Sequence, residues 1–179
     1  MQATVLILGA RGRFGLAAAS AFADAGWRVL GQMRPGAQAG ADQRIEWLAT
    51  DLRDTQALAT AARGAAVVVH ALNPAYTNAA WREQVAPMMD VAIAVTRVLD
   101  ATLMVPGNVY NFGAAMPAVL REDTPQLAQT VKGRLRIGME SQLQRSGVRA
   151  VVIRAGDFFG SGRGTWFDTV MVKRIQKGV

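Results

Sequence analysis

Several residue types are rare or absent in this chain of 179 residues, and each absence excludes a class of structure or catalysis. It has no cysteine, which excludes disulfides and thiolate catalysis and permits a reducing compartment. His70 is its one histidine, so no metal site built on histidines is expected. No apolar run approaches the roughly 20 residues of a membrane span, and the first residues lack the basic region of a signal peptide. We therefore expect a cytoplasmic protein without a membrane partner.

Basic residues outnumber acidic ones, 20 to 13. The formal net charge is +7, which by itself raises the question of nucleic acid. Most of the basic residues are arginines scattered along the chain, and the one local group is Lys173, Arg174 and Lys177. Scattered arginine suits a protein that handles phosphorylated small molecules, so we expect a small-molecule substrate and no nucleic acid.

The most informative stretch is residues 4–34. An apolar run, Val5–Leu8, leads into Gly9, Gly12 and Gly15, and an alanine-rich segment of helical length and a second apolar run at 29–30 follow. This order predicts strand, glycine turn, helix and strand, the opening βαβ unit of a dinucleotide-binding sheet. Gly9 would allow the tight turn, Gly12 the close approach of a pyrophosphate to the helix N-terminus, and Gly15 close packing of helix on strand.

The rest of the chain alternates in the same way. Further strands are predicted at 45–49, 65–70, 108–112 and 150–154, and helices at 55–62, 78–103 and 126–145 and from about residue 165. Asp54 is expected to cap the first of these helices, and Gly147 to end the third. The pattern predicts an α/β fold with a doubly wound parallel sheet, a Rossmann domain. We expect one NAD(P)-binding domain over 1–179, with 156–179 a remnant or the start of a substrate-binding part.

One apolar stripe has two interpretations. Val85, Met88, Met89, Ala92 and Val95 recur at three- and four-residue spacing on the long helix predicted at 78–103. The stripe is expected either to pack into the core or to form half of a helix–helix seam in a homodimer.

The motifs together resemble the short-chain dehydrogenase/reductase superfamily, in its extended, epimerase/dehydratase-like branch. The glycine spacing is G-x-x-G-x-x-G, and Asp51-Leu52, the end of the fourth strand at Ala71-Leu72, and the segment from Arg154 to Gly160 follow in the family's order. The resemblance implies a Rossmann fold, a nicotinamide dinucleotide, and contacts from Asp51 and Leu52 to adenine. It also implies that Ala71 and Leu72 line the cofactor.

The end of the second strand bears on which dinucleotide is bound. An acidic residue there would bind the ribose 2′-hydroxyl of NAD, whereas an arginine accommodates the 2′-phosphate of NADP. This strand ends in Arg34, without an acid, and Arg11 and Arg13 add positive charge in the glycine turn. We expect NADP rather than NAD. The expected cofactor-binding residues are Gly9, Arg11, Gly12, Arg13, Phe14, Gly15, Arg34, Asp51, Leu52, Ala71, Leu72 and Arg136.

The catalytic pattern of the family is missing. The resemblance implies a serine or threonine after strand five and Tyr-x-x-x-Lys on the next helix, but Lys132 and Arg136 stand at the tyrosine and lysine positions. Lys132 is the acid/base candidate if its proton is released, since an arginine does not release one. Tyr110 and Asn111 are the nearest groups that could hydrogen-bond a substrate.

Two functions remain. The first is an atypical NADP-dependent oxidoreductase or epimerase/dehydratase-like enzyme that transfers hydride on an alcohol, carbonyl or sugar-like substrate. The second is a non-catalytic NADP(H)-binding regulator or sensor, suggested by the joint loss of the serine, tyrosine and lysine. We favour the enzyme, because altered active-site residues often mark a changed reaction.

Overall fold

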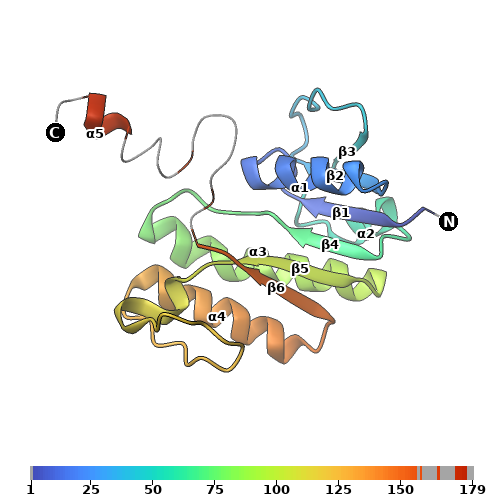
Figure 1. Cartoon of the computed structure of the whole chain (residues 1–179). Coiled ribbons are helices and arrows are strands. Elements are labelled where there is room, and N and C mark those ends of the chain that lie inside the picture. The colour runs from blue at the N-terminus through green and yellow to red at the C-terminus, as the bar shows by residue number, and fades with distance from the viewer. Residues whose placement is uncertain (1, 157, 159–164, 166–171, 177–179) are drawn as a thin grey trace.

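Six parallel strands form one sheet in the order β3-β2-β1-β4-β5-β6 (Figure 1). The computed structural model describes residues 2–156, 158, 165 and 172–176. The strands are β1 Thr4–Leu8, β2 Arg28–Met33, β3 Ile45–Ala49, β4 Val67–His70, β5 Thr102–Gly107 and β6 Ala150–Arg154. The helices are α1 Arg13–Asp24, α2 Thr55–Ala61, α3 Asn78–Leu99, the 3₁₀ helix η1 Tyr110–Ala115, α4 Val131–Ser146 and α5 Lys173–Gln176. The predicted doubly wound α/β fold is confirmed.

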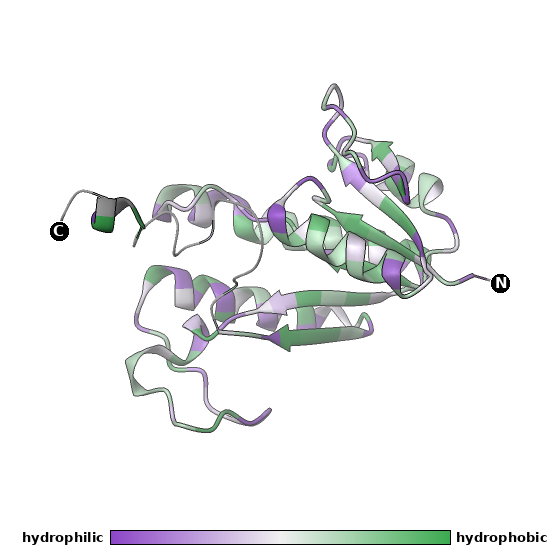
Figure 2. Ribbon diagram, turned by 45° about the horizontal axis from the view of Figure 1, so that its top comes forward, coloured by the Kyte–Doolittle hydropathy of each residue, from purple (hydrophilic) through white to green (hydrophobic). Residues whose placement is uncertain are grey.

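Each sheet face has its own apolar core. Val5 and Ile7 of β1 point to the face that α1 covers, where they pack with Ala19. Leu6 and Leu8, on the opposite face, belong to the larger core that α2, α3 and α4 complete. Figure 2 shows the apolar strands between these helices. Of the helices that the structure describes, none is both long enough and apolar enough to cross a bilayer.

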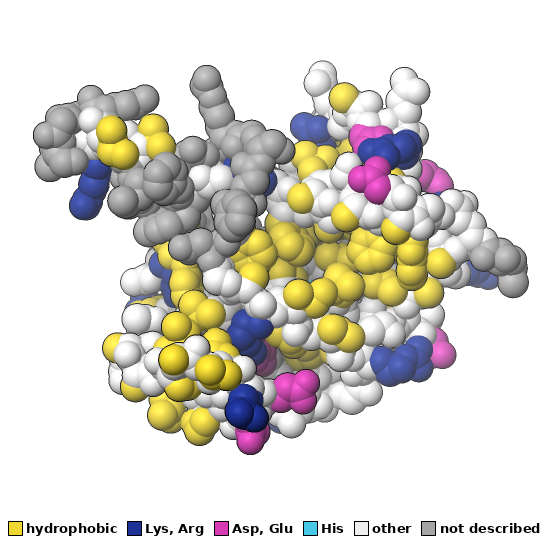
Figure 3. Space-filling view, in the orientation of Figure 1, with side chains coloured by type: hydrophobic (Ala, Val, Ile, Leu, Met, Phe, Trp, Pro, Cys, Tyr) yellow, Lys and Arg dark blue, Asp and Glu magenta, His cyan; other side chains and the backbone are white. Residues whose placement is uncertain are grey.

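Strand β6, at the edge of the sheet, is less buried by helices than the central strands are. Val151 and Ile153 are 48% and 51% exposed, and hydrophobic side chains gather over the strands beside α1 in the space-filling view (Figure 3). The apolar stripe of α3, by contrast, lies inside the chain, since Val85, Met89 and Val95 are buried in the larger core. Packing into the core therefore accounts for these three residues.

The boundary between α3 and β5 differs from the prediction. The helix ends at Leu99 rather than near residue 103, because Asp100 takes a left-handed conformation (φ 48°) and its N–H caps the last turn. Strand β5 then occupies Thr102–Gly107, so the predicted strand at 108–112 is wrong, and Tyr110–Ala115 is a 3₁₀ helix. A short apolar run such as 103–105 fits a helix and a strand equally by periodicity, and its place between β4 and β6 decided the outcome.

Other boundaries follow local capping. Asp54 caps α2 as predicted, its side chain accepting from the Ala57 N–H at 2.9 Å. Helix α4 starts at Val131 rather than near residue 126, because the Thr130 side chain caps it, and it ends at Gly147 (φ 70°) as predicted. The predicted helix from about residue 165 falls mostly outside the described residues, within which Lys173–Gln176 is helical.

Candidate functional site

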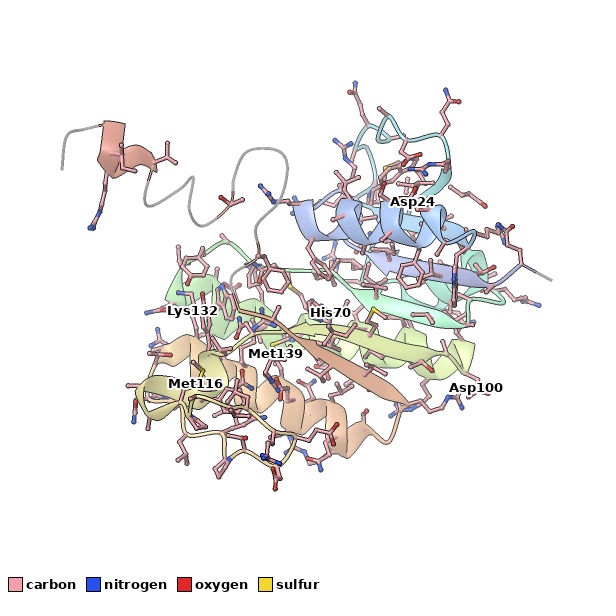
Figure 4. All side chains as sticks on the ribbon, viewed as in Figure 1. Asp24, His70, Asp100, Met116, Lys132 and Met139 are labelled. Carbon is pink, nitrogen blue, oxygen red and sulfur yellow. The ribbon has the colours of Figure 1, made fainter. Side chains whose placement is uncertain are left out.

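The carboxyl ends of the parallel strands meet at one edge of the sheet. The strand order reverses between β1 and β4, and the crevice outside these two strand ends is where sheets of this kind bind ligands. Figure 4 shows His70, at the end of β4, and Lys132 toward this edge, with Asp100 at the opposite one. We call this carboxyl end of the sheet the binding edge.

The glycine turn has the backbone geometry that its sequence predicts. Gly9 has φ 77°, and a Cβ on Gly15 would lie 2.5 Å from the Gly9 oxygen, so α1 packs on β1 at a distance that only glycine permits. A Cβ on Gly12 would lie 3.3 Å from the same oxygen and 4.0 Å from the Ala71 oxygen. Gly12 is also the N-cap of α1 and offers no side chain to the first N–H groups. The turn therefore presents bare backbone donors at the binding edge.

A residue that the sequence reasoning missed fixes this turn. Gln32 of β2 is 2% exposed, and its side-chain oxygen accepts from the Gly9 N–H at 3.0 Å. Its amide nitrogen donates to the carbonyl oxygens of Met33 and Thr50, at 3.0 and 2.8 Å. One buried amide thus ties the turn to β2 and to the end of β3. The signal in the sequence was a single polar residue inside an otherwise apolar strand.

The predicted cofactor residues near the turn fall into two groups. Leu72 and Ala71 lie directly against Gly9, since a Cβ there would come within 2.9 Å of a Leu72 methyl and 3.2 Å of the Ala71 oxygen. Arg11 and Arg34 are exposed and form no ion pair within the described part of the chain. Both arginines are thus available to an anion.

Three further predicted contacts have neighbours within the chain. Phe14 packs edge-on against Phe158, with ring centroids 5.7 Å apart, and Leu52 packs against the larger core. The Asp51 carboxylate binds the Arg53 guanidinium at 2.8 Å, and these hydrogen bonds lower the pKa of Asp51 to about 2. Asp51 is therefore a turn residue paired with Arg53 in this structure. Arg13 is half-buried at the start of α1.

On the other side of the crevice, α4 carries two cations beside aromatic rings. Lys132 and Arg136 lie four residues apart and share a helix face. The Arg136 guanidinium lies 5.0 Å from the ring centre of buried Trp81, and Lys132 Nζ lies 4.2 Å from the ring centre of Tyr76. Lys132 Nζ also donates to the Asn78 side chain at 3.0 Å. The two predicted residues thus flank an aromatic pair.

Tyr76 is a second residue that the sequence reasoning missed. Its hydroxyl lies 3.0 Å from the hydroxyl of Tyr110, 34 positions along the chain. Tyr76 follows β4 and Tyr110 begins η1 after β5, so the carboxyl ends of neighbouring strands bring the two phenols together. The available signal was a tyrosine in the connection between a buried strand and the next helix.

Asn111 lies in a buried polar network instead of on the surface of the edge. It is fully buried, and its amide donates to Gln126 and to Glu140, both at 2.9 Å. The Glu140 carboxylate also binds Arg154 in a bidentate pair, at 3.0 and 2.8 Å, which joins α4 to the end of β6. In this structure the network holds η1 and β6 against α4.

His70 and Arg136 share a small cavity. Its volume is about 10 Å³, the space of one water molecule. His70 is 2% exposed and its Nε2 has no hydrogen-bond partner among the described residues. Burial, with a smaller contribution from the Arg136 charge, lowers the pKa of His70 to about 4, so the ring is neutral at pH 7. Burial also lowers the pKa of Arg136.

The comparisons with known proteins agree with this architecture. The family model described as RmlD substrate binding domain matches residues 3–178. No curated protein matches the chain.

Solved structures share the fold at low sequence identity. WbmH from Bordetella bronchiseptica, solved with NAD+, superposes with a TM-score of 0.79 at 15% identity, over 99% of this chain and 64% of its own. WbmG from the same organism, solved with NAD and UDP, gives 0.77 at 18% identity, over 99% and 61%. The UDP-glucose 4-epimerase from Brucella ovis, solved with NAD, gives 0.76 at 18%, over 89% and 54%. The chain thus spans less than two thirds of the length of these proteins.

Proposed function

We propose that this chain, which belongs to the RmlD substrate binding domain family, binds a nicotinamide dinucleotide at the binding edge and uses it to interconvert an alcohol and a carbonyl. The substrate class is a sugar-like molecule, and the reaction is that of an oxidoreductase or of an epimerase or dehydratase. The observation that carries the proposal is the glycine turn, where the start of α1 offers bare N–H groups beside the crevice between β1 and β4. The bound nicotinamide would accept or supply the hydride.

The residues of the turn fit a dinucleotide. A Cβ on Gly12 would lie 3.3 Å from the Gly9 oxygen, and the absence of a side chain there would let a pyrophosphate approach the backbone closely. Ala71 and Leu72, against Gly9, would line the dinucleotide, and Asp51 and Leu52 would border the adenine. Arg136 would hold the nicotinamide ribose, and Phe14 with Arg13 would border the phosphates.

We further propose NADP rather than NAD as the preferred cofactor. Strand β2 ends in buried Met33, where an NAD-binding sheet of this kind carries an acid, and exposed Arg34 follows. A guanidinium can bind the 2′-phosphate with two parallel hydrogen bonds. Arg11, also exposed, adds a second positive charge at this end of the edge.

The catalytic roles fall to side chains on the α4 side of the crevice. Lys132 and Tyr110 would assist proton transfer at the substrate hydroxyl, since both lie at the binding edge beside Tyr76. Asn111 would position η1 rather than touch the substrate, because its amide is fully buried.

The sensor is the second candidate. The observation in its favour is that α4, which carries Lys132 and Arg136, has no tyrosine, whereas the resemblance to the short-chain superfamily implies Tyr-x-x-x-Lys on this helix. A protein of this kind would bind NADP(H) and regulate a partner without turnover. Hydride transfer to or from any substrate, reduced by Lys132→Ala, would count against it.

The experiment is calorimetric titration with NADP+ and, separately, with NAD+, on the native chain, on Arg34→Ala and on Arg63→Ala. Loss of the charge-assisted bonds at Arg34 should weaken NADP+ binding by about 10- to 100-fold and leave NAD+ binding unchanged. Arg63 is an exposed arginine next to α2 and serves as the matched control. Equal affinities for the two nucleotides would refute the NADP preference, and no binding of either would refute the proposed function.

A further inference from the structure

We infer that Tyr76 and Tyr110 act as one proton-transfer pair, with Tyr76 as the group that exchanges a proton with the substrate. This inference rests on the proposed function and names the residues of its chemical step. The two hydroxyl oxygens lie 3.0 Å apart, within hydrogen-bond distance. In the family that the chain resembles, a single tyrosine on a helix performs this task. Here the two tyrosines come from the loop after β4 and from the start of η1, which follows β5.

The surrounding residues fix the Tyr76 ring. It packs edge-on against Trp81, with centroids 6.2 Å apart and planes at 87°, and Trp81 is only 2% exposed. Lys132 Nζ also contacts the Tyr76 ring, 4.2 Å from the ring centre. An anchored ring loses little freedom when a substrate binds, which favours a defined position of its hydroxyl.

Tyr110 is held through its backbone. Its N–H donates to the Asn108 side chain at 3.0 Å. Its carbonyl oxygen lies so close to Gly133 of α4 that a Cβ at Gly133 would collide with it. This contact sets the Tyr110 backbone, and with it the start of η1, directly on the first turn of α4.

Exposure separates Tyr76 from His70 and Asn111, two other polar groups at this edge. Tyr76 is 49% exposed, whereas His70 is 2% exposed and Asn111 is fully buried. Neither buried group can meet a substrate without a rearrangement of the core. The Lys132 ammonium beside the ring would stabilise negative charge that develops on the phenol as its proton leaves.

In the reducing direction a bound reduced nicotinamide would supply a hydride, with its electron pair, to the carbonyl carbon and be oxidised in turn, while the C=O π electrons move to oxygen. That oxygen takes the proton of the Tyr76 hydroxyl, whose O–H bond breaks. The Tyr110 hydroxyl donates a hydrogen bond to the resulting phenolate, and a water proton restores the phenol. In the oxidising direction the substrate O–H proton would move to the Tyr76 phenolate, and the bound oxidised nicotinamide would accept the hydride, with its electron pair, that leaves carbon.

The composition of the chain allows a direct test. Tyr76 and Tyr110 are its two tyrosines, so ring-labelled tyrosine gives two NMR signals, which Tyr76→Phe and Tyr110→Phe assign. With NADP+ bound, addition of UDP-glucose should shift both signals, and addition of uridine should shift neither. Movement of neither signal with UDP-glucose would overturn the inference.

Kinetics of UDP-glucose conversion give the second readout. Tyr76→Phe should lower kcat by about 10²- to 10⁴-fold while NADP+ affinity by calorimetry stays unchanged. The double variant should lose no more than the more damaged single variant, as expected of groups that act as a unit. Thr60→Ala, which removes an exposed hydroxyl from α2, is the control.

The outcomes separate this inference from the proposed function. Additive losses in the double variant, or full activity of Tyr76→Phe, would overturn the pair while the cofactor site stands. Absence of NAD+ and NADP+ binding in the native chain would overturn the proposed function and the inference with it.

Discussion

Buried His70 makes the stability of the fold depend on pH in a defined window. The ring is 2% exposed, and its pKa falls from the ordinary 6.5 to about 4 because burial disfavours the charged form. In the unfolded chain the imidazole regains its ordinary pKa. The unfolded state therefore binds more protons than the folded state between these two values, and the free energy of unfolding must fall as the pH drops through the window.

The magnitude follows from the separation of the two pKa values. Each unit is worth about 1.4 kcal/mol, so His70 contributes about 3 kcal/mol at pH 7 that is absent at pH 4 and below. Of this amount, about 2 kcal/mol should already be lost at pH 5. A domain with a typical stability of about 5–15 kcal/mol would show such a loss clearly.

Urea unfolding at pH 7 and pH 5, followed by tryptophan fluorescence, measures the loss. His70→Leu should abolish most of the difference between the two pH values, because leucine does not titrate. Asp51→Asn is the control, since the pKa of Asp51 is about 2 and its pair with Arg53 titrates below the window. An equal stability of the native chain at both pH values would refute the reasoning, and so would a His70→Leu variant that keeps the full loss.

Two further predictions concern packing and charge, each with a control on the same chain. Gly15→Ala should destabilise the fold by about 1–3 kcal/mol in urea unfolding, because its Cβ would lie 2.5 Å from a backbone oxygen, whereas Gly138→Ala on α4, with open space around it, should be neutral or stabilising by up to about 1 kcal/mol. An equal effect of the two changes would contradict the steric argument. Glu140→Gln should lower the free energy of unfolding by about 3 kcal/mol, since Arg154, 23% exposed, loses its counter-charge. Glu46→Gln, which breaks a pair with Arg28 that is about half exposed, should lower it by less than about 1 kcal/mol. Similar losses in the two variants would show that burial does not govern the strength of the Glu140–Arg154 pair.

Local patterns in the sequence determined the framework of the sheet. The run Val5–Leu8 followed by glycines predicted β1, its turn and α1, because a buried strand, a positive φ and a close helix contact each restrict the residue types at their own position. The Asp54 cap and the Gly147 stop were predicted for the same reason, since a helix end depends on a few adjacent residues. That the strands run parallel then follows from the alternation of strands and helices.

Tertiary structure decided the features that join distant residues. The apolar run at 103–105 forms β5 because it pairs with β4 on one side and with β6 on the other. Such pairing depends on distant residues, and local periodicity does not predict it. The approach of Tyr76 to Tyr110 depends on the register of β4 and β5, and the burial of Asn111 depends on Glu140 of α4. Side chains that act together at the binding edge come from separate loops, so the sequence predicts their types while the packing of the sheet sets which of them meet.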